Sequence, residues 1–432
     1  MTAALRHRQF RLLFAGQIVS NLGDWLDFLA LAVLIAYVWH KGPAALAGLA
    51  IAIAIPAILI APFAGVLVDR WPKRSVMILA DLGRAGLVIG LVLAPSVWVV
   101  YPLVFFKATL STFFNPAEAA TIRFTLPEHL LQPAVALSQL VLQATKVLGP
   151  ALGGLLVGLW SPRVALGADA ATFLCSAAVL SRLAPVESPV SLEDESEEAA
   201  GPSFWRELQD GVRYIATRRA LLICVAGMSA MVFLLIAFDT LSPLAFRELG
   251  VSRGLFGLAV AAIGLGGVAG TILVGRWGAA VNPFALLGGG ATIVGCLVVL
   301  IGVALLANLG LSPVTWVPVL LVVGVASAGV LIAAPTIMQR ETPAALMGRV
   351  SATASAIPTV FSLAAPIAGS ALAAWRGVGF TFTVAGGGLA VLGLLLAVVR
   401  TPVGIPPAGA TPHDPAASNG AVEVAVREEV VP

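Results

Sequence analysis

The stretch GVLVDRWPKR, at residues 65–74, decides how this chain folds. A long apolar run ends at this stretch, and another begins directly after it. Between the two runs, residues 69–74 hold one acid, three bases and a proline. A tight charged turn between two apolar runs is typical of a short loop at a membrane face, because the charges stay in water while the runs cross the bilayer. The stretch therefore predicts a chain that crosses a membrane before and after this loop.

The composition of the whole chain agrees with a polytopic membrane protein. Of its 432 residues, 59% are hydrophobic and 11% are charged, and the mean hydropathy is +0.99. Soluble globular chains average about 45–50% apolar and about 25% charged residues. The net charge of +3 is small and the bases are spread along the chain, which argues against a nucleic-acid surface. The cysteines Cys175, Cys224 and Cys296 lie in apolar runs without metal-ligand spacing, so we expect small buried hydrophobes and no disulfide or metal site.

About twelve segments are long and apolar enough to cross a bilayer, which takes about 20 residues each. The predicted spans are 10–37, 45–68, 75–95, 97–122, 133–158, 162–182, 219–246, 254–275, 281–307, 314–338, 346–374 and 379–399. We expect an all-α membrane protein with twelve transmembrane helices in two bundles of six. The basic N-terminus resembles a signal peptide at first, but its apolar run continues to Tyr37, carries two acids and lacks a cleavage site. We interpret it as a retained first span.

A polar gap after the sixth span divides the chain into two halves. The predicted domains are a first bundle at 1–183, a cytoplasmic linker at 184–218, a second bundle at 219–400 and a disordered cytoplasmic tail at 401–432. The acidic start of the linker predicts disorder. In residues 204–215, apolar side chains repeat at helical spacing among arginines, which predicts an amphipathic helix at the inner membrane face, with a solvated linker helix as the alternative. Lys and Arg concentrate on the side of the N-terminus, so both termini are expected in the cytoplasm.

The spacing G-x-x-x-D-R-x-x-K-R closely resembles the loop signature of the major facilitator superfamily, between its second and third membrane helices. The matching residues here are Gly65, Asp69, Arg70, Lys73 and Arg74. Stretches in residues 10–24, 81–85, 169–174 and 339–350 resemble one branch, the drug:proton antiporters that include macrolide and enterobactin exporters. The resemblance covers roughly residues 10–400 and implies a proton-coupled efflux transporter in the bacterial cytoplasmic membrane.

The predicted fifth span resembles the exporter motif G-x-x-x-G-P-x-x-G-G. It matches at Gly149, Pro150, Gly153 and Gly154, but Thr145 stands where the first glycine belongs. Two glycines four residues apart let a neighbouring helix approach, and a proline bends the helix between them. Tight packing without a gating role is the alternative.

The two halves of the chain also share weak sequence repeats. The pattern around residues 64–71 returns weakly at 269–277, and the pattern at 148–154 returns at 365–370. These pairs match the second span with the eighth and the fifth with the eleventh. Paired repeats of this kind are typical of the transporter folds that the resemblance implies.

An anion is stabilised at a helix N-terminus, and Asp69 is well placed to face one. The resemblance implies that this end belongs to the eleventh span in the other half, near Gly348 and Arg349, and that the contact latches the cytoplasmic side shut. As an alternative, the bases of the loop at residues 65–74 only orient it toward the cytoplasm.

Polar stripes run along three spans of the first half. The stripes are Gln17, Asn21, Asp24 and Asp27; then Lys107, Ser111, Asn115 and Glu118; then Gln139, Gln143 and Lys146. In the fold that the resemblance implies, the first and fourth spans line the central cavity. The expected substrate cavity therefore holds Gln17, Asn21, Lys107, Asn115, Gln143 and Lys146, with Asp239 from the otherwise apolar second half.

The number of residues between each charge and the end of its helix gives the depth of that charge in the membrane. Asp27 and Lys107 each lie about ten residues from an outer helix end, or roughly 15 Å, so an ion pair between them is possible. Asp24 lies one turn deeper and is expected to lack a fixed partner. A desolvated carboxyl group takes up a proton more readily than one in water, so Asp24 is the first candidate for proton coupling, followed by Asp27 and Glu118. A static ion-pair network is the alternative; Asp81, Arg84 and Asp169 are expected to be structural, away from the cavity.

Other function classes find little support in the sequence. The chain has no G-x-x-x-x-G-K-[ST] phosphate loop, no H-E-x-x-H motif and no nucleophile elbow, so we expect no enzyme, no catalytic residues and no cofactor. Three interpretations remain: a proton-coupled exporter of amphiphilic compounds, a transporter of a natural metabolite such as a siderophore or lysophospholipid, and a membrane scaffold or receptor. We expect a monomer whose partners are a small-molecule substrate, protons and lipid.

Overall fold

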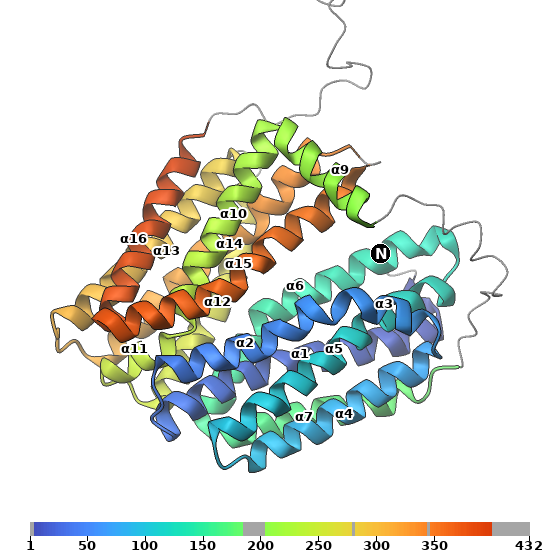
Figure 1. The fold of residues 1–432 in the computed structure, drawn as a ribbon, viewed down its shortest axis with the longest axis horizontal. Coiled ribbons are helices and arrows are strands. Elements are labelled where there is room, and N and C mark those ends of the chain that lie inside the picture. Colours follow the sequence, from blue (N-terminus) through green and yellow to red (C-terminus); the bar gives the residue numbers. More distant parts are fainter. Residues whose placement is uncertain (1–3, 185–203, 279–280, 344–345, 400–432) are drawn as a thin grey trace, which may run out of the picture.

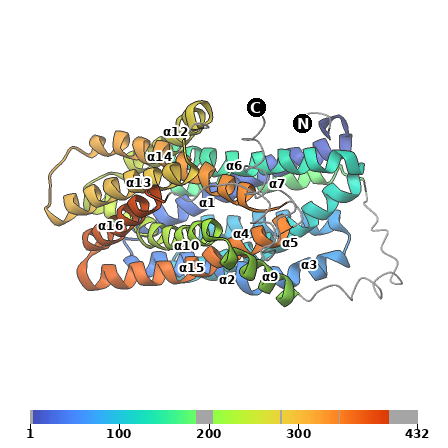
Figure 2. The same cartoon turned by 90° about the horizontal axis from the view of Figure 1, so that it is seen from above.

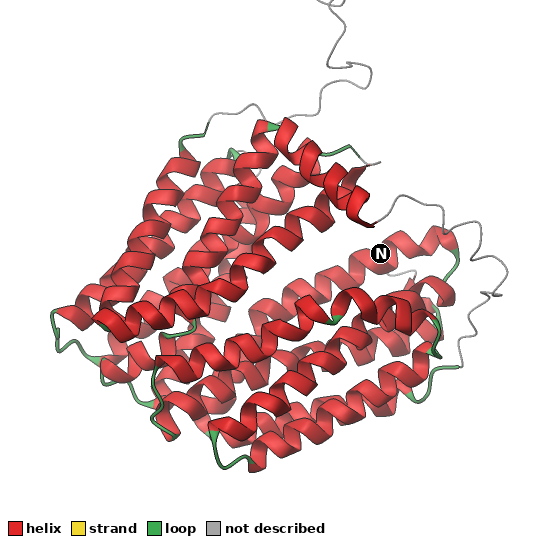
Figure 3. Cartoon of the chain, viewed as in Figure 1, coloured by secondary structure: helices red, strands yellow, loops and turns green. Residues whose placement is uncertain are grey.

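The structure is a computed structural model that describes residues 4–184, 204–278, 281–343 and 346–399, and these residues form helices and no strands (Figure 3). The first part of the chain holds η1 (Ala4–Arg6), α1 (Arg8–Val33), η2 (Leu34–Val38), α2 (Pro43–Leu59), α3 (Ala61–Asp69), α4 (Lys73–Leu93), α5 (Val97–Thr125), α6 (Glu128–Leu159) and α7 (Pro162–Leu180). The second part holds α9 (Phe204–Thr217), α10 (Arg219–Asp239), α11 (Ser242–Glu248), α12 (Arg253–Trp277), α13 (Pro283–Leu306), η4 (Pro313–Thr315), α14 (Trp316–Glu341), α15 (Met347–Arg376) and α16 (Val378–Ala397).

Ten helices of the described ranges are long and apolar enough to cross a membrane. The all-α membrane class is thereby confirmed, and the predicted count of twelve spans is visible in part. Two predicted spans are interrupted. The second span breaks at Ile60 into α2 and α3, and the seventh ends at Asp239 before the short helix α11. In both cases a proline, Pro62 or Pro243, is the second residue of the next helix, where its missing N–H is tolerated but would interrupt a continuous helix.

The helices form two groups, α1–α7 and α10–α16, that lie side by side (Figures 1 and 2). The groups meet along two seams, where α6 packs against α12 and α2 packs against α15 (Figure 2). They come together at the end that carries α11 and diverge toward the end that carries α9 (Figure 1). We call the first end the closed end and the second end the open end. The predicted domain boundaries remain a prediction, and the tail at 401–432 lies outside the described residues.

The α6–α12 seam is a contact between backbones at the closed end. A Cβ atom on Gly154 of α6 would lie 2.2 Å from the carbonyl oxygen of Gly257 of α12, and one on Gly257 would lie 2.3 Å from that of Gly154. Gly158 and Gly254 repeat the contact one turn further along. A Cβ atom on Gly158 would lie 2.8 Å from the carbonyl oxygen of Gly254, and one on Gly254 would lie 3.0 Å from that of Gly158. Only glycine permits so close an approach of two helices.

The glycine pair predicted to let a neighbouring helix approach, Gly149 and Gly153, faces α1 rather than α12. Gly149 faces α1 in its own group, where a Cβ atom would lie 2.4 Å from the Trp25 side chain, and Gly153 has ordinary van der Waals space beside Leu26. The seam with the other group uses Gly154 instead. The motif was recognised correctly, but its spacing alone does not say which glycine faces which neighbour.

The three cysteines are free thiols, and they differ in their burial. Cys224 on α10 is buried, as expected, whereas Cys175 on α7 and Cys296 on α13 are exposed, contrary to the expectation. An apolar side chain in a membrane helix can face lipid as well as the protein core, so an apolar run does not by itself predict burial.

Two further contacts join the groups at the closed end. The Arg247 guanidinium of α11 donates a hydrogen bond to the carbonyl oxygen of Ala36, in the π-helical turn η2. The Tyr37 ring of the same turn stacks on Phe256 of α12, with 5.7 Å between ring centroids. Ala36 lies in the last turn before this helix ends, where backbone carbonyl groups lack partners within the helix and can accept such a bond.

The predicted helix in the linker is α9, and its last turns pack on the second group. Ile215 is buried against Leu221, Val225 and Val350. The Tyr214 hydroxyl donates to the carbonyl oxygen of Glu341 across 3.3 Å. This end of α9 is therefore attached to α10 and α15, and the placement of α9 at a membrane face stays a prediction.

Candidate functional site

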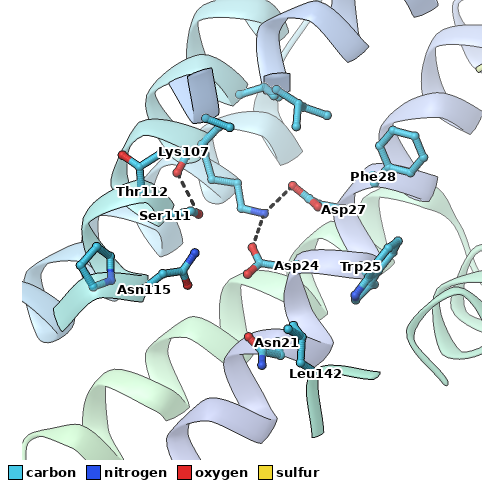
Figure 4. Close-up of a pocket in the computed structure, with 15 residues that line it drawn as sticks. Asn21, Asp24, Trp25, Asp27, Phe28, Lys107, Ser111, Thr112, Asn115 and Leu142 are labelled. Carbon is cyan, nitrogen blue, oxygen red and sulfur yellow. Dashed lines mark hydrogen bonds and ion pairs between the residues drawn. The ribbon is translucent and has the colours of Figure 1, made fainter. Parts of the chain in front are cut away.

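A cavity of about 590 Å³ lies within the first helix group. Its wall comes from α1, α2 and α5, with Leu142 from α6 (Figure 4). The polar and charged residues among those that line it are Asn21, Asp24, Asp27, Lys107, Ser111, Thr112 and Asn115. Residues three or four apart share one face of a helix, and for this reason the polar stripes of α1 and α5 reach the same cavity.

Lys107 lies at the centre of a buried charge cluster. Its ammonium nitrogen lies 2.8 Å from Oδ2 of Asp27, to which it donates a hydrogen bond, and 3.0 Å from Oδ1 of Asp24 (Figure 4). It also lies 3.9 Å from Oδ2 of Asp169, on α7. The side chains of Lys107 and Asp27 are 8% exposed and that of Asp169 is fully buried, whereas that of Asp24 is 35% exposed. Asp24 is thus the carboxylate of this set with the best access to the cavity.

Arg84 of α4 extends the cluster on the other side of Asp24. It pairs with Asp81 one turn away on the same helix, and one of its terminal nitrogens lies 3.4 Å from Oδ2 of Asp24. Its guanidinium group lies over the rings of Phe114 and Phe173, 4.4 Å and 4.5 Å from their centroids. Such contacts help to keep a buried cation in place.

Close packing of α7 against α1 brings Asp169 near Lys107. A Cβ atom on Gly23 of α1 would lie 2.1 Å from the Thr172 hydroxyl oxygen and 2.4 Å from Oδ1 of Asp169, both on α7. Any other residue at position 23 would displace the side chains of Thr172 and Asp169. Gly23 therefore sets the spacing at which Asp169 approaches Lys107.

The cluster contains more acids than bases. Four carboxylates share two basic groups, so two negative charges stay uncompensated when all six groups are ionised. The groups are Asp24, Asp27, Asp81, Asp169, Lys107 and Arg84. Uncompensated charge is costly inside a membrane protein. Protons that bind to this cluster therefore bring its net charge closer to zero.

Glu118 of α5 is a further buried acid beside the cluster. Its side chain interacts electrostatically with Arg84 and Asp81. Its Oε1 atom has no hydrogen-bond partner among the described residues, and the residue is 8% exposed. It is not among the residues that line the cavity. Glu118 is thus a second, less accessible place for a proton.

One of the sequence-based expectations for the charges is corrected here. The predicted pair of Asp27 and Lys107 is present. Asp24, expected to lack a fixed partner, is held by both Lys107 and Arg84. Asp81, Arg84 and Asp169, expected to be structural and away from the cavity, are not among the residues that line it, although they join the same charge cluster. Their charges within apolar runs were a visible signal, but the sequence does not say which faces of α1, α4, α5 and α7 meet.

The remaining predicted cavity residues divide into four sets. Asn21 and Asn115 line the cavity, whereas Gln17 is buried at 7% exposure and is not among its lining residues. Asp239 lines a different cavity, between the two helix groups. The side chains of Gln143 and Lys146 lie outside the described part of the structure.

The loop motif is only partly described. Lys73 is buried, Arg70 is exposed, and Arg74 donates to the carbonyl oxygen of Ser181 just beyond α7. A Cβ atom on Gly65 would meet no neighbour within 4 Å. The side chains of Asp69, Pro150, Gly348 and Arg349 fall outside the described residues, so the predicted latch between the halves stays a prediction.

Comparison with known proteins places these features in a family. The family model described as Major Facilitator Superfamily matches residues 13–360. An uncharacterized MFS-type transporter of Bacillus subtilis, YfiS, is 28% identical over 390 residues, which cover 89% of this chain and 91% of that protein. A protein of the same organism named as a bacilysin exporter, BacE, is 30% identical over 62% of this chain and 66% of its own. Macrolide efflux protein A of Streptococcus pyogenes is 26% identical over 55% of this chain and 58% of its own.

Solved structures share the fold at low sequence identity. A POT family peptide transporter superposes with a TM-score of 0.64 at 12% identity, over 93% of this chain and 99% of that one. The nucleoside transporter NupG superposes with a TM-score of 0.61 at 13% identity, over 90% of this chain and 98% of that one. These likenesses confirm the fold that the sequence predicted.

Proposed function

Because this chain belongs to the major facilitator superfamily, a family of membrane transporters, we propose that it is a secondary active transporter that couples proton entry to the efflux of amphiphilic, drug-like molecules. The observation that carries the proposal is the surplus of carboxylates in the buried charge cluster, which borders the 590 Å³ cavity. A scaffold or receptor has no use for such costly buried charges. A proton-coupled transporter does, because it needs groups that bind and release protons as the cavity changes its access.

Asp24 is the proposed entry point for the proton. It is the carboxylate of the cluster most exposed to the cavity, and it contacts both Lys107 and Arg84. Protonation of Asp24 removes the negative charge of α1 that holds Arg84 and one of the two that hold Lys107, the other being that of Asp27. The contacts of α1 with α4 and α5 then weaken, and the helix group can adopt a different arrangement. Asp27 and Glu118 are the proposed secondary proton sites.

Alternating access follows from the arrangement of the two helix groups. They diverge at the end that carries α9 and meet at the glycine seam of α6 and α12 (Figure 1). We assign the open end to the cytoplasm, because the bases near the ends of the spans concentrate on that side. In this assignment a substrate enters the cavity from the cytoplasm or the inner leaflet, and separation of the seam releases it outside.

Two considerations support efflux of amphiphilic compounds. One wall of the central region is charged, whereas the cavity between the groups is mostly apolar, so a molecule with a polar and an apolar part suits both. Relatives named for macrolide efflux and bacilysin export match more than half of the chain. The cytoplasmic membrane of a bacterium is the proposed location, and both termini are proposed to lie in the cytoplasm.

Transport in liposomes tests the proposal. Purified protein with an imposed pH gradient is expected to move an amphiphilic dye, and collapse of the gradient with a protonophore is expected to stop net movement. Dye movement of equal rate with and without a gradient would favour the second interpretation, a metabolite transporter without proton coupling. A complete absence of movement for a broad panel of dyes would favour a scaffold.

Asp24→Asn is expected to remove coupling while leaving binding and exchange in place. The amide keeps the size of the side chain but neither gains nor loses a charge by binding or releasing a proton at physiological pH. Gradient-driven dye accumulation is expected to fall to the background of empty liposomes, whereas exchange of dye across the membrane without a gradient persists. Both rates are measured in the same liposome preparation.

Glu128→Gln is the matched control for this variant. Glu128 is an exposed acid at the start of α6, outside the cluster, and its loss is expected to leave gradient-driven accumulation unchanged. If Asp24→Asn accumulates dye as the parent protein does, the assignment of Asp24 is wrong. Asp27→Asn and Glu118→Gln then become the variants to measure.

A further inference from the structure

A second cavity, of about 230 Å³, lies between the two helix groups at the closed end, and its chemistry differs from that of the first. Its wall combines residues of α1 and α2 with residues of α10–α14 and α16. Six aromatic side chains line it, namely Trp25, Phe28, Phe238, Phe246, Phe256 and Phe382. Asp239, at the end of α10, is the one ionisable residue among those that line it.

Asp239 is exposed to this cavity and has no ion pair among the described residues. The nearest base along the chain, Arg247 of α11, donates its hydrogen bond to the Ala36 carbonyl. Lys107, which lines the other cavity, is already held by Asp24 and Asp27. Asp239 therefore offers a negative charge that no described base of the protein neutralises.

The aromatic wall is held rigidly. Phe246 packs on Phe256, with 5.4 Å between ring centroids, and Phe238 packs on Phe382 across 5.5 Å. Phe246, Phe256 and Phe382 are at most 2% exposed, so their rings are fixed by the surrounding core. A preformed wall of aromatic rings beside a carboxylate is suited to the recognition of organic cations, since the rings and the charge attract a positive group and the rings exclude water.

From this geometry we propose that the cavity at Asp239 binds the cationic group of an organic substrate, such as a tertiary or quaternary ammonium with an attached aromatic ring. The inference rests on the proposed function, because it names the class of substrate that this transporter carries. Asp239 neutralises the cation and the rings enclose its methyl groups. A volume of about 230 Å³ accommodates this group, and the larger apolar part of an amphiphile extends past Trp25 and Phe28, which line both cavities.

The site also separates substrate from proton within the same molecule. The proton sites proposed above are contributed by the first helix group, whereas Asp239 is contributed by the second. A cation at Asp239 contacts residues of both groups, because α1 and α2 form the opposite wall. Its binding therefore favours the arrangement in which the groups are together around it.

Equilibrium binding of radiolabelled benzyltrimethylammonium to purified protein tests the site. N,N-dimethylbenzamide, which is neutral and of similar size, serves as competitor. The cation is expected to bind the parent protein, and the amide is expected to compete at least about tenfold more weakly. Asp239→Asn, which keeps the shape of the side chain, is expected to weaken cation binding at least about tenfold, whereas Asp239→Glu retains most of it. Phe246→Leu is expected to weaken cation binding less than Asp239→Asn does. Thermal unfolding first establishes that this variant is folded.

Glu128→Gln removes an exposed acid at the start of α6 that lines neither cavity, and as the matched control it is expected to leave cation binding within about twofold of the parent value. Equal affinities of the parent and Asp239→Asn, equal competition by the amide, or no binding of the cation would each overturn the inference. Gradient-driven transport of a neutral amphiphile is measured in parallel. If this transport persists while cation binding fails, the substrate assignment is wrong and the proposed function stands. If Asp239-dependent binding occurs without any gradient-driven transport, the cation site stands and the proposed function is wrong.

Discussion

Gly154→Leu is expected to abolish transport and to hold the two helix groups apart at the closed end. Even the Cβ atom of a new side chain would lie 2.2 Å from the carbonyl oxygen of Gly257 and 2.9 Å from the backbone nitrogen of Ala261. Both neighbours are backbone atoms of α12, which cannot rotate away as a flexible side chain can. The helices must separate, and the arrangement described here loses its closest contact.

The consequence for function is specific to one step of the cycle. A transporter that cannot bring α6 and α12 together cannot close this end, so the cavity cannot open to one side alone. Net accumulation of substrate is expected to disappear, and leakage down a gradient is expected to replace it. Gly154→Ala is expected to have the same effect in milder form, since its single methyl group still overlaps the Gly257 carbonyl.

Distance measurements between spin labels check the structural part of this prediction. Labels at Lys41→Cys and Gly310→Cys sit in exposed loops of the first and second helix groups, in a background where Cys175, Cys224 and Cys296 are replaced by alanine. Gly154→Leu is expected to lengthen the main distance between the labels. Gly167→Leu on α7 is the control, because a Cβ atom there meets nothing within 4 Å. An unchanged distance distribution in Gly154→Leu, together with normal transport, would contradict the role of the seam.

Lys107→Met is the second change with a large expected effect. It removes the base that lies within 4 Å of three carboxylates, those of Asp24, Asp27 and Asp169, and leaves Arg84 as the remaining base of the cluster. Removal of one partner of a buried ion pair costs about 3–5 kcal/mol, because the other charge stays buried without compensation. We expect a marked fall in the thermal unfolding temperature in detergent and a loss of gradient-driven transport.

A second substitution discriminates between a charge effect and lost packing. In the double variant Lys107→Met and Asp27→Asn, the base and its closest carboxylate partner are both neutral, so part of the lost thermal stability is expected to return. Lys41→Met, in an exposed loop, is the control and is expected to unfold at the parent temperature. If Lys107→Met alone unfolds at the parent temperature too, the cluster does not depend on this base. An unfolding temperature of the double variant below that of Lys107→Met would point to lost packing instead.

The limits of sequence-based prediction are clearest at the charge cluster. The acids and bases of the cluster stand out in the sequence, since each lies within an apolar run. The pair of Asp27 and Lys107 followed from depth along two helices. The links of Asp24 to Arg84 and of Asp169 to Lys107 did not follow, because they depend on how α1, α4, α5 and α7 are rotated about their axes.

The glycine seam and the aromatic cavity show the same limit at the boundary between the groups. The motif at residues 149–154 was recognisable, but the contact partner of each glycine required the position of α12. The aromatic residues around Asp239 come from α1, α10, α11, α12 and α16, which are spread over most of the chain, and no local spacing connects them.

By itself, the amino-acid sequence determined the all-helical membrane class, the resemblance to the family and most of the segments that cross the bilayer. Those properties follow from local rules, because a lipid environment demands long apolar runs and satisfied backbone hydrogen bonds wherever the chain crosses. Only the tertiary structure decided which charges share one cluster, which glycines touch across the seam and what surrounds Asp239. These contacts depend on which sides of helices distant in sequence pack together. In a mostly apolar chain the hydrophobic pattern does not specify those sides.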